Sequence, residues 1–226
     1  MAGPTGRGGP HAFVDDLDQP VLAAGDEHHL ARVLRLRPGD PLTLSDGRGS
    51  WRPARFGSPP VPDGPIVAVP PAVPSITIAF ALVKGERPEW IVQKLTELGV
   101  DDIRPFVAER SVVRWTEEKR THAAERWRTV AREASMQSRR CWLPSVYPPC
   151  RFADVAALDG AALADRDGGP VDLTHPVLLI GPEGGWSDTE RDLGLATVRL
   201  GPQVLRAETA AIAAATLLAS AREQAS

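Results

Sequence analysis

The chain of 226 residues has only two cysteines and no long apolar run. Two cysteines, Cys141 and Cys150, are too few for a disulfide framework, and their spacing is not that of a metal-binding or redox Cys-x-x-Cys pair. We therefore expect two reduced thiols. A membrane span needs roughly 18 consecutive apolar residues, and Glu208 interrupts the Ala-rich stretch near the C-terminus. No charged-then-apolar signal sequence opens the chain, so we expect a cytoplasmic protein without a membrane partner.

Several common site signatures are also missing. The sequence has no G-x-G-x-x-G after a strand, no Walker-type phosphate loop and no G-x-S-x-G elbow, which disfavours an ordinary dinucleotide site, a P-loop and a hydrolase nucleophile. Of five histidines only His28 and His29 are adjacent, and neighbours on a helix diverge by roughly 100°. We therefore expect no metal site.

Lysine is scarce, because the 26 basic residues include only Lys84, Lys94 and Lys119. Arginine supplies the remaining positive charge, and its planar fork suits phosphate and base recognition, although genome composition alone could produce the same bias. The formal net charge of −3 excludes a uniformly basic nucleic-acid coat and an acidic disordered tail protein. The 42% of hydrophobic residues is enough for a buried core.

The charges are segregated along the chain. Residues 11–27 hold five acids and no Lys or Arg, whereas residues 28–55 hold six arginines and two acids. Residues 104–140 hold ten basic residues against five acids, and residues 150–192 hold three arginines against nine acids. This pattern is typical of a local polyanion site, and solvated helix faces are an equally good explanation from charge alone.

A proline-rich segment divides the chain. Seven prolines fall within residues 57–75 and exclude a helix there, which predicts one domain over residues 1–72 and another over residues 73–226. The first domain has short strands, tight turns and one helix from Asp26, as N-cap, to about Leu36, which favours a small β-barrel or sandwich. Its predicted strands are Phe13-Val14, Leu42–Ser45, Trp51–Phe56 and Ile66–Val69.

Strands and helices alternate in the second part, which predicts an α/β domain with a mostly parallel sheet. Pro88 suits the first turn of a helix that ends at Gly99, Thr116 can cap a longer helix, and Ser187 with Glu190 forms a capping box. A final Ala-rich helix begins near Ala207. The predicted strands are Ile76–Val83, Ile103–Val107, Val177–Ile180 and Thr197–Leu200.

Two glycine-containing turns follow strands of this predicted sheet. Ile180–Trp186 and Leu200–Thr209 each lead from a strand into a helix, at the strand ends where open α/β sheets bind ligands. Glycine lets the backbone approach a flat ligand, and helix starts offer free N–H groups. Gly and Pro could equally serve only to turn the chain. On the long helix, Arg132 and Gln137 could contact RNA or simply lie at the surface.

Taken together, these segments resemble the bacterial 16S rRNA uridine-N3 methyltransferases (RsmE-type) of the SPOUT superfamily. The similarity is ordered along nearly the whole chain, in seven short fragments. They are His28–Leu30 with Val33–Arg37 and Gly39-Asp40, Lys84-Gly85, Lys94–Val100, Glu109–Ser111, Arg132–Ala134 with Gln137-Ser138 and Arg140, Gly181–Gly185, and Leu205–Ala210.

The resemblance implies a PUA-like barrel that binds rRNA and an α/β domain whose last segment threads a loop as a trefoil knot. It also implies S-adenosylmethionine (SAM) as cofactor, held largely by backbone groups of the knot, and a homodimer in which two knots pack together. The apolar C-terminal helix fits such a twofold dimer. The implied cofactor residues are Ile180, Gly181, Glu183, Gly184, Gly185, Leu200, Gly201, Leu205, Arg206 and Thr209.

For the reaction, we expect Arg206 to stabilise the uracil anion and Glu208 to position Arg206 or to accept the N3 proton. The alternative is that these two residues form only a salt bridge and that water is the base. Two departures from the family pattern are Gln203, where a basic residue is expected, and a Gly/Pro-rich leader, Met1–Pro10, which we expect to be disordered. The expected RNA-binding residues are Arg32, Arg35, Arg37, Arg110, Arg114, Arg132, Gln137 and Arg140.

Two other functions remain open from the sequence. A different SPOUT methyltransferase would act on tRNA or on a ribose hydroxyl, and a non-catalytic rRNA-binding assembly factor would keep the fold without turnover. The preceding barrel argues against the first, and the intact Gly181–Gly185 and Leu205–Thr209 segments argue against the second.

Overall fold

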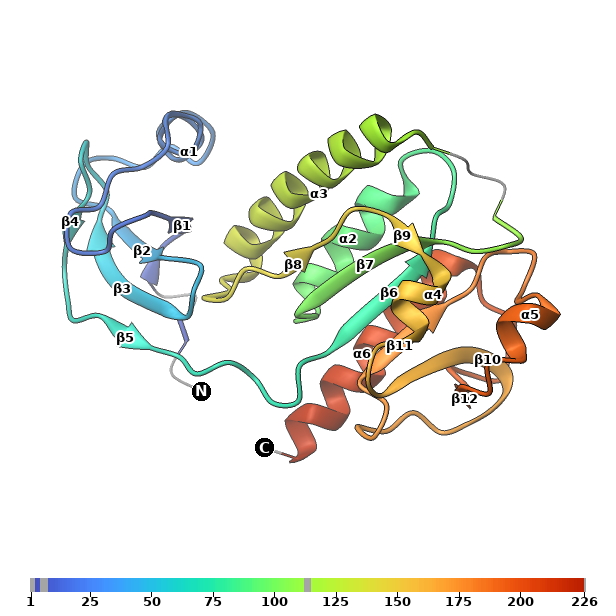
Figure 1. Cartoon of the computed structure of the whole chain (residues 1–226). Coiled ribbons are helices and arrows are strands. Elements are labelled where there is room, and N and C mark those ends of the chain that lie inside the picture. Colours follow the sequence, from blue (N-terminus) through green and yellow to red (C-terminus); the bar gives the residue numbers. More distant parts are fainter. Residues whose placement is uncertain (1–2, 5–7, 112–114, 226) are drawn as a thin grey trace. The chain divides into compact units, whose positions relative to one another are not determined.

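The computed structural model describes residues 3–4, 8–111 and 115–225. They form two compact units, which are considered separately: Met1–Pro71 with Arg132–Leu143, and Ala72–Ala131 with Pro144–Ser226. Figure 1 traces the chain through both. The sequence predicts one domain over residues 1–72 and another over residues 73–226. It does not predict that Arg132–Leu143 packs with the first unit, because this segment is distant in sequence from the rest of that unit.

The first unit is built on a five-stranded sheet in the order β1-β2-β3-β4, with β5 also paired to β3. β1 runs parallel to β2, and the remaining pairs are antiparallel. Apolar side chains such as Leu30, Leu42 and Leu44 form its buried core. The strands are β1 (His11–Phe13), β2 (Pro41–Ser45), β3 (Ser50–Arg55), β4 (Val61–Pro62) and β5 (Val67–Ala68).

His11 attaches the distant segment to this sheet. Its Nδ1 lies 2.9 Å from Thr43 Oγ1 on β2, and its Nε2 lies 3.2 Å from the Arg140 carbonyl oxygen. Burial lowers the pKa of His11 to about 4, so the ring is neutral at pH 7 and one nitrogen donates while the other accepts. Arg139 donates to the Gly9 carbonyl, and the Thr43 backbone N–H donates to the Pro10 carbonyl at 2.9 Å. The prediction that Met1–Pro10 is disordered is therefore wrong for Gly9 and Pro10.

The helical stretch of the first unit differs from the prediction at its start. It consists of α1 (Ala24–His28) followed by η2 (His29–Val33), a π-helical turn, and its N-cap is Ala23. Asp26 was predicted to be the N-cap, but its carboxylate instead accepts hydrogen bonds of 3.0 and 2.5 Å from Arg132. A bidentate pair with a guanidinium is stronger than a bond to one backbone N–H, which explains the difference.

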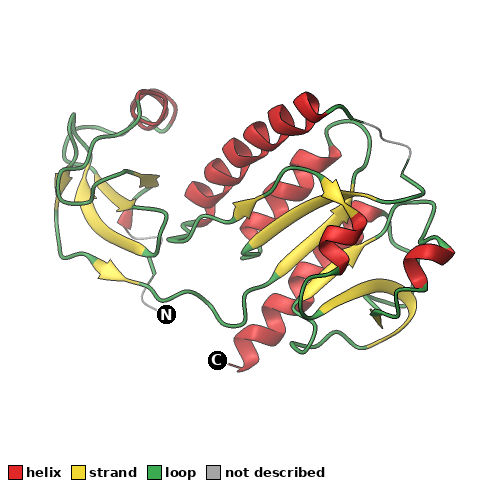
Figure 2. Cartoon of the chain, in the orientation of Figure 1, coloured by secondary structure: helices red, strands yellow, loops and turns green. Residues whose placement is uncertain are grey.

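The second unit confirms the predicted α/β class with a parallel sheet. Seven strands, all parallel, lie in the order β12-β10-β11-β6-β7-β8, with β9 also paired to β7 (Figure 2). The trefoil threading remains a prediction. The strands are β6 (Thr77–Ala81), β7 (Asp102–Val107), β8 (Ser145–Val146), β9 (Cys150–Arg151), β10 (Ala161–Gly169), β11 (Val177–Ile180) and β12 (Ala196–Val198).

Helices cover both faces of this sheet. Side chains alternate along β6, so that Ile78 and Phe80 pack with α2, α6 and the first part of α3, whereas Ala79 and Ala81 pack with α4 and Trp186. The result is a three-layer arrangement with the sheet in the middle (Figure 1). The helices are α2 (Arg87–Glu97), α3 (Glu117–Ser138), α4 (Phe152–Ala156), α5 (Asp188–Arg191) and α6 (Ala207–Ala225).

Local signals set several helix ends as predicted. Pro88 lies in the first turn of α2, and Gly99 follows that helix with φ +84°. At α5 the Ser187 hydroxyl accepts from the Glu190 N–H, and the Glu190 carboxylate accepts from the Ser187 N–H, which confirms the capping box. None of the described helices is long and apolar enough to cross a bilayer.

Candidate active site

A cleft of about 270 Å³ opens at the carboxyl ends of β11 and β12, beside the middle of β10. Its walls come from the turn after β11, the segment between β12 and α6, the middle of β10, Arg191 of α5 and the first turn of α6. Parallel strands all end at the same edge of a sheet, so segments far apart in the sequence meet here. We call it the first cleft.

β10 contributes to the first cleft because it leaves the sheet midway. Its register with β12 shifts between Ala164 and Gly169, so Asp165 and Arg166 drop out of the pairing and line the cleft. Asp165 is fixed there by Arg191, whose guanidinium lies 2.7 Å from its carboxylate. A Cβ at Gly168 would lie 2.5 Å from the Val198 backbone nitrogen, so this approach of β10 to β12 requires glycine.

Trp186 holds the turn after β11 in place. Its indole N–H donates to the Ala164 carbonyl at 3.0 Å, and its ring stacks on Phe106 with centroids 6.2 Å apart and planes 4° apart. Glu190 also accepts from the Glu109 N–H at 2.9 Å, which ties the start of α5 to the segment after β7. The turn is therefore rigid before any ligand binds.

The interior of the first cleft combines apolar side chains with accessible backbone. Leu200, Leu205 and Ala210 supply the apolar walls. A Cβ built at Gly201 or Gly185 would meet no atom within 4 Å, and Gly185 has φ +69°. Backbone N–H and C=O groups are consequently reachable beside an apolar slot, an arrangement that suits a flat heteroaromatic group with polar edges.

Most of the residues predicted to bind the cofactor line this cleft. Those that do are Ile180, Gly181, Glu183, Gly185, Leu200, Gly201 and Leu205, whereas Gly184, Arg206 and Thr209 are outside its lining. Ala207, within the segment Leu205–Thr209 that the resemblance assigns to the cofactor, lines the cleft as well. Sequence reasoning missed the contributions of β10 and of four further residues. The missed residues are Ala164, Asp165, Arg166, Trp186, Arg191, Val204 and Ala210. Gln203, noted as a departure from the family pattern, also lines the cleft.

The two residues predicted to be catalytic are placed differently from each other. Arg206 is exposed and immediately precedes α6, whereas the Glu208 side chain is only 15% exposed. No ion pair joins them within the described part of the chain; Glu208 Oε2 instead lies 3.8 Å from Arg87, where it accepts no hydrogen bond. Arg87 also binds Glu183 at 2.6 Å. Arg87 therefore connects α2 to both segments that are predicted to bind the cofactor.

Comparisons with known proteins agree with this geometry. The RNA methyltransferase domain family matches residues 70–219, and the RNA methyltransferase PUA domain matches residues 25–59. The ribosomal RNA small subunit methyltransferase E of Mycobacterium tuberculosis is 36% identical over 89% of this chain and 88% of its own length. The chain belongs to the ribosomal RNA small subunit methyltransferase E family. The Bacillus subtilis member is 30% identical over 82% of this chain and 84% of its own.

Solved structures of this family share the whole fold. The methyltransferase E of Neisseria gonorrhoeae, bound to SAM, has a TM-score of 0.76 and 28% identity over 92% of this chain and 95% of its own. A Legionella pneumophila structure with bound SAM has a TM-score of 0.78 and 31% identity, over 93% and 97% of the two chains. The family's two-part organisation, a PUA-like N-terminal domain and a methyltransferase domain, is therefore present here.

The predicted RNA-binding residues of the PUA-like unit are mostly accessible. Arg32 in η2 and Arg35 and Arg37 beyond it are all exposed, and Arg35 has φ +58°, which ends the helical stretch. Gln137, on the part of α3 that belongs to this unit, is also exposed. Arg140 is half-buried, with its carbonyl at His11, and Arg132 is held by Asp26.

In the methyltransferase unit, Arg110 borders the first cleft. Its side chain is exposed, and its guanidinium donates to the Gly184 carbonyl at 3.3 Å. A Cβ at Gly184 would lie 3.4 Å from the Arg110 Cβ, so glycine permits this contact. Arg114 lies outside the described residues. Arg110, a predicted RNA-binding residue, therefore contacts the turn after β11 directly.

Proposed function

We propose that the protein transfers a methyl group from SAM to N3 of a uridine in 16S rRNA. The observation that carries this proposal is the first cleft, which lies at the sheet edge expected for it and is lined by most of the residues that the family resemblance assigns to SAM. Relatives of matching fold were crystallised with SAM, and relatives that are 30% and 36% identical are named as small-subunit rRNA methyltransferases. Because the proposed substrate is ribosomal RNA, we also propose that the enzyme is cytoplasmic.

The residues present fit SAM. The adenine would lie among Leu200, Leu205 and Ala210, and backbone groups of Gly181–Gly185 and Gly201 would bind its polar edges. The Asp165 carboxylate, already oriented by Arg191, is suited to accept from a hydroxyl or an ammonium group. The open space at Gly201 and Gly185 would let SAM approach the backbone closely at these two residues.

SAM supplies an activated methyl group on a sulfonium, so the protein must chiefly align the acceptor, exclude water and handle one proton. Uracil N3 carries that proton, and its loss leaves negative charge on O2 and O4. Arg206, exposed beside the cleft without an ion-pair partner among the described residues, would stabilise this charge. Glu208 would accept the proton, and Arg87 at 3.8 Å keeps its carboxylate oriented.

Two variants test these roles. Arg206→Ala is expected to keep SAM affinity and to lower kcat by about 100-fold, the usual cost of removing one charge-stabilising donor. Glu208→Gln is expected to lower kcat most at neutral pH and less at alkaline pH, where solvent removes the proton more readily. Titration calorimetry with SAM and methyl-transfer rates measure the two effects separately. Unchanged turnover in Arg206→Ala would remove this arginine from the mechanism.

For the RNA, we propose contacts from Arg32, Arg35 and Arg37 in one unit and from Arg110 and Arg114 in the other. Gln137, Arg132 and Arg140 complete the proposed set, with Arg132 and Arg140 also serving the packing described above. Charge-neutralising variants should weaken rRNA binding and make it less dependent on salt. Each phosphate contact that is lost reduces the number of counterions released when the RNA binds. A salt dependence that the variants leave unaltered would contradict this assignment.

We also propose a homodimer, as the family resemblance implies. Most apolar residues of α6 are buried within the unit itself, which leaves Leu217, 40% exposed, as the main apolar side chain available on that helix. Light scattering during gel filtration should give the mass of a dimer. Leu217→Glu is expected to shift it toward the monomer, and a monomeric wild-type protein would refute the proposal.

One measurement tests the function as a whole. Purified protein and SAM should introduce a single 3-methyluridine into 16S rRNA of subunits from a strain that lacks the gene, as read by nuclease digestion and mass spectrometry. A methyl group on a ribose or on tRNA would identify a different methyltransferase. If the protein neither binds SAM nor methylates RNA, it is a non-catalytic assembly factor.

A further inference from the structure

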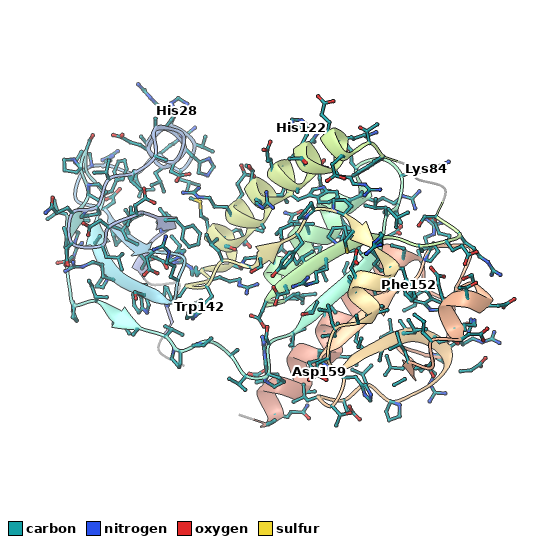
Figure 3. The ribbon with its side chains drawn as sticks, viewed as in Figure 1. His28, Lys84, His122, Trp142, Phe152 and Asp159 are labelled. Carbon is teal, nitrogen blue, oxygen red and sulfur yellow. The ribbon has the colours of Figure 1, made fainter. Side chains whose placement is uncertain are left out.

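A second cleft of about 410 Å³ lies in the methyltransferase unit, between the turn that joins β6 to α2 and the first half of α3. Figure 3 labels one residue from each side, Lys84 on the turn and His122 on α3. No residue of this second cleft belongs to the first. The lining residues are Val83, Lys84, Gly85, Pro88, Glu89, Trp115, Lys119, His122, Ala123, Arg126 and Trp127.

One wall of the second cleft is aromatic. Trp127 is buried in the core at 2% exposure, and Trp115 packs against it with ring centroids 5.9 Å apart. Trp115 itself is only partly buried, so part of its ring remains available at the cleft. An accessible indole face is a platform on which a nucleic-acid base of any sequence can stack.

The charge of the second cleft is positive. Its single lining carboxylate, Glu89, is neutralised by Arg126 at 2.8 Å. Lys119 places its ammonium 5.0 Å over the Trp115 ring, and Lys84 is exposed; neither forms an ion pair within the described ranges. Two of the chain's three lysines therefore meet in one cleft, beside an aromatic wall, whereas the third, Lys94, is paired with Glu97 on α2.

The β6–α2 turn connects the two clefts. Lys84 and Gly85 of this turn line the second cleft, and Arg87, the first residue of α2, binds Glu183, which lines the first. An RNA strand bound in the second cleft would therefore be separated from the methyl donor in the first cleft only by this short turn. Ammonium groups bind phosphates as point charges, and the indole binds a base, so the two features together match a nucleotide.

We propose that the second cleft binds a nucleotide of single-stranded RNA that neighbours the target uridine, with its base on Trp115 and its phosphates at Lys84 and Lys119. The inference rests on the proposed rRNA substrate. A base flipped for methylation leaves its neighbours unstacked, and a stacking platform beside the catalytic cleft compensates for that loss and fixes the position of the strand.

The scarcity of lysine makes a direct test available. The full-length protein with SAM is treated with a lysine-acetylating reagent, alone or with a ten-nucleotide oligouridine, and acetylation is quantified by mass spectrometry. We expect the RNA to protect Lys84 and Lys119 and to leave Lys94 as reactive as before. Equal reactivity of Lys84 and Lys119 with and without RNA would overturn the proposal. Equal protection by uridine monophosphate would also overturn it, because the cleft would then be a free-nucleotide site.

Variants give a second, independent readout. Trp115→Leu keeps an apolar side chain for packing but removes the stacking surface, and should raise the Kd for oligouridine by about 5- to 150-fold. Lys84→Gln and Lys119→Gln should each lower the salt dependence of log K by about 0.7. Trp90→Leu, at an exposed tryptophan of α2 outside the cleft, and Lys94→Gln are the matched controls. Equal effects of the controls would refute a specific site.

The two proposals fail in different ways. Failure of the wild-type protein to methylate 16S rRNA would refute the proposed function, whereas the acetylation pattern would still report whether RNA occupies the second cleft. Intact methylation with no protection of Lys84 and Lys119 would refute the second cleft alone. In all of the cleft variants SAM affinity should equal that of the wild type, because none of these residues lines the first cleft.

Discussion

The neutral His11 makes the first unit sensitive to acid. Its pKa is lowered from 6.5 to about 4, chiefly by burial; the bond to the Arg140 carbonyl opposes this shift, and the charge of Arg139 adds a smaller lowering effect. The unfolded chain therefore binds one more proton than the folded chain between these two pH values. The stabilisation is complete above pH 6.5 and is lost as the pH falls toward 4.

The size of this effect follows from linkage. With pKa values of 6.5 and about 4, the loss between pH 7 and pH 5 is about 2 kcal/mol for this single group. Replacing His11 with Gln removes the titration. The variant should be less stable at pH 7, but its loss between pH 7 and pH 5 should be about 2 kcal/mol smaller than that of the wild type.

Urea unfolding at the two pH values, with hydrogen exchange and mass spectrometry to follow residues 11–56 separately, measures the difference. His122→Gln, at an exposed histidine of the other unit, is the control and should keep the wild-type pH dependence for these residues. If His11→Gln and wild type lose the same stability between pH 7 and pH 5, the buried neutral histidine is not what links this unit to pH.

Three further predictions concern the methyltransferase unit and the thiols. Gly201→Val should weaken SAM binding by about 10-fold or more in calorimetry with an unchanged Tm, because its side chain would enter open space in the first cleft; unchanged affinity would exclude this wall from the cofactor site. Arg87→Met should cost about 1–2 kcal/mol in urea unfolding by leaving buried Glu208 without a cation, and Glu208→Gln in the same chain should recover most of it. Burial raises the pKa of Cys141 to about 11 and raises that of Cys150, so both thiols should resist iodoacetamide at pH 8 until the protein is unfolded; rapid labelling of the folded protein would contradict this.

Strong local signals made much of the methyltransferase unit predictable. β6 and β11 are continuous apolar runs, and such runs become buried strands of a parallel sheet. Pro88 and the Ser187 capping box specify helix starts through their own backbone bonds. The first glycine turn follows β11, so it lies at the carboxyl edge of the sheet; the second follows β12, which is short and mostly exposed but parallel to its neighbour β10, and so reaches the same edge.

β10 could not be predicted from its own residues. Its second half, Ala164–Gly169, is charged and glycine-rich; it pairs only with β12, through Ala164 and Gly169, whereas β11 pairs with residues 161–163. Pairing of this kind is set by contacts distant in sequence. The acidic Asp165 of the first cleft was missed for the same reason. Trp186 could have been found, because it directly follows the Gly181–Gly185 turn and a buried indole there must pack against that turn.

Arginine counts in the sequence overstate the charge that is available to RNA. In the PUA-like unit Arg52 donates to the carbonyls of Leu17 and Gly64, and Arg55 binds Asp63, so both hold loops together. Arg132 is likewise engaged by Asp26. A guanidinium with several fixed donors can cross-link a fold in this way, whereas a lysine ammonium on a flexible stem holds backbone less well. In an arginine-rich chain the few lysines are therefore better indicators of an exposed anion-binding surface than the arginines, which is why we propose that the RNA strand binds where Lys84 and Lys119 share a cleft.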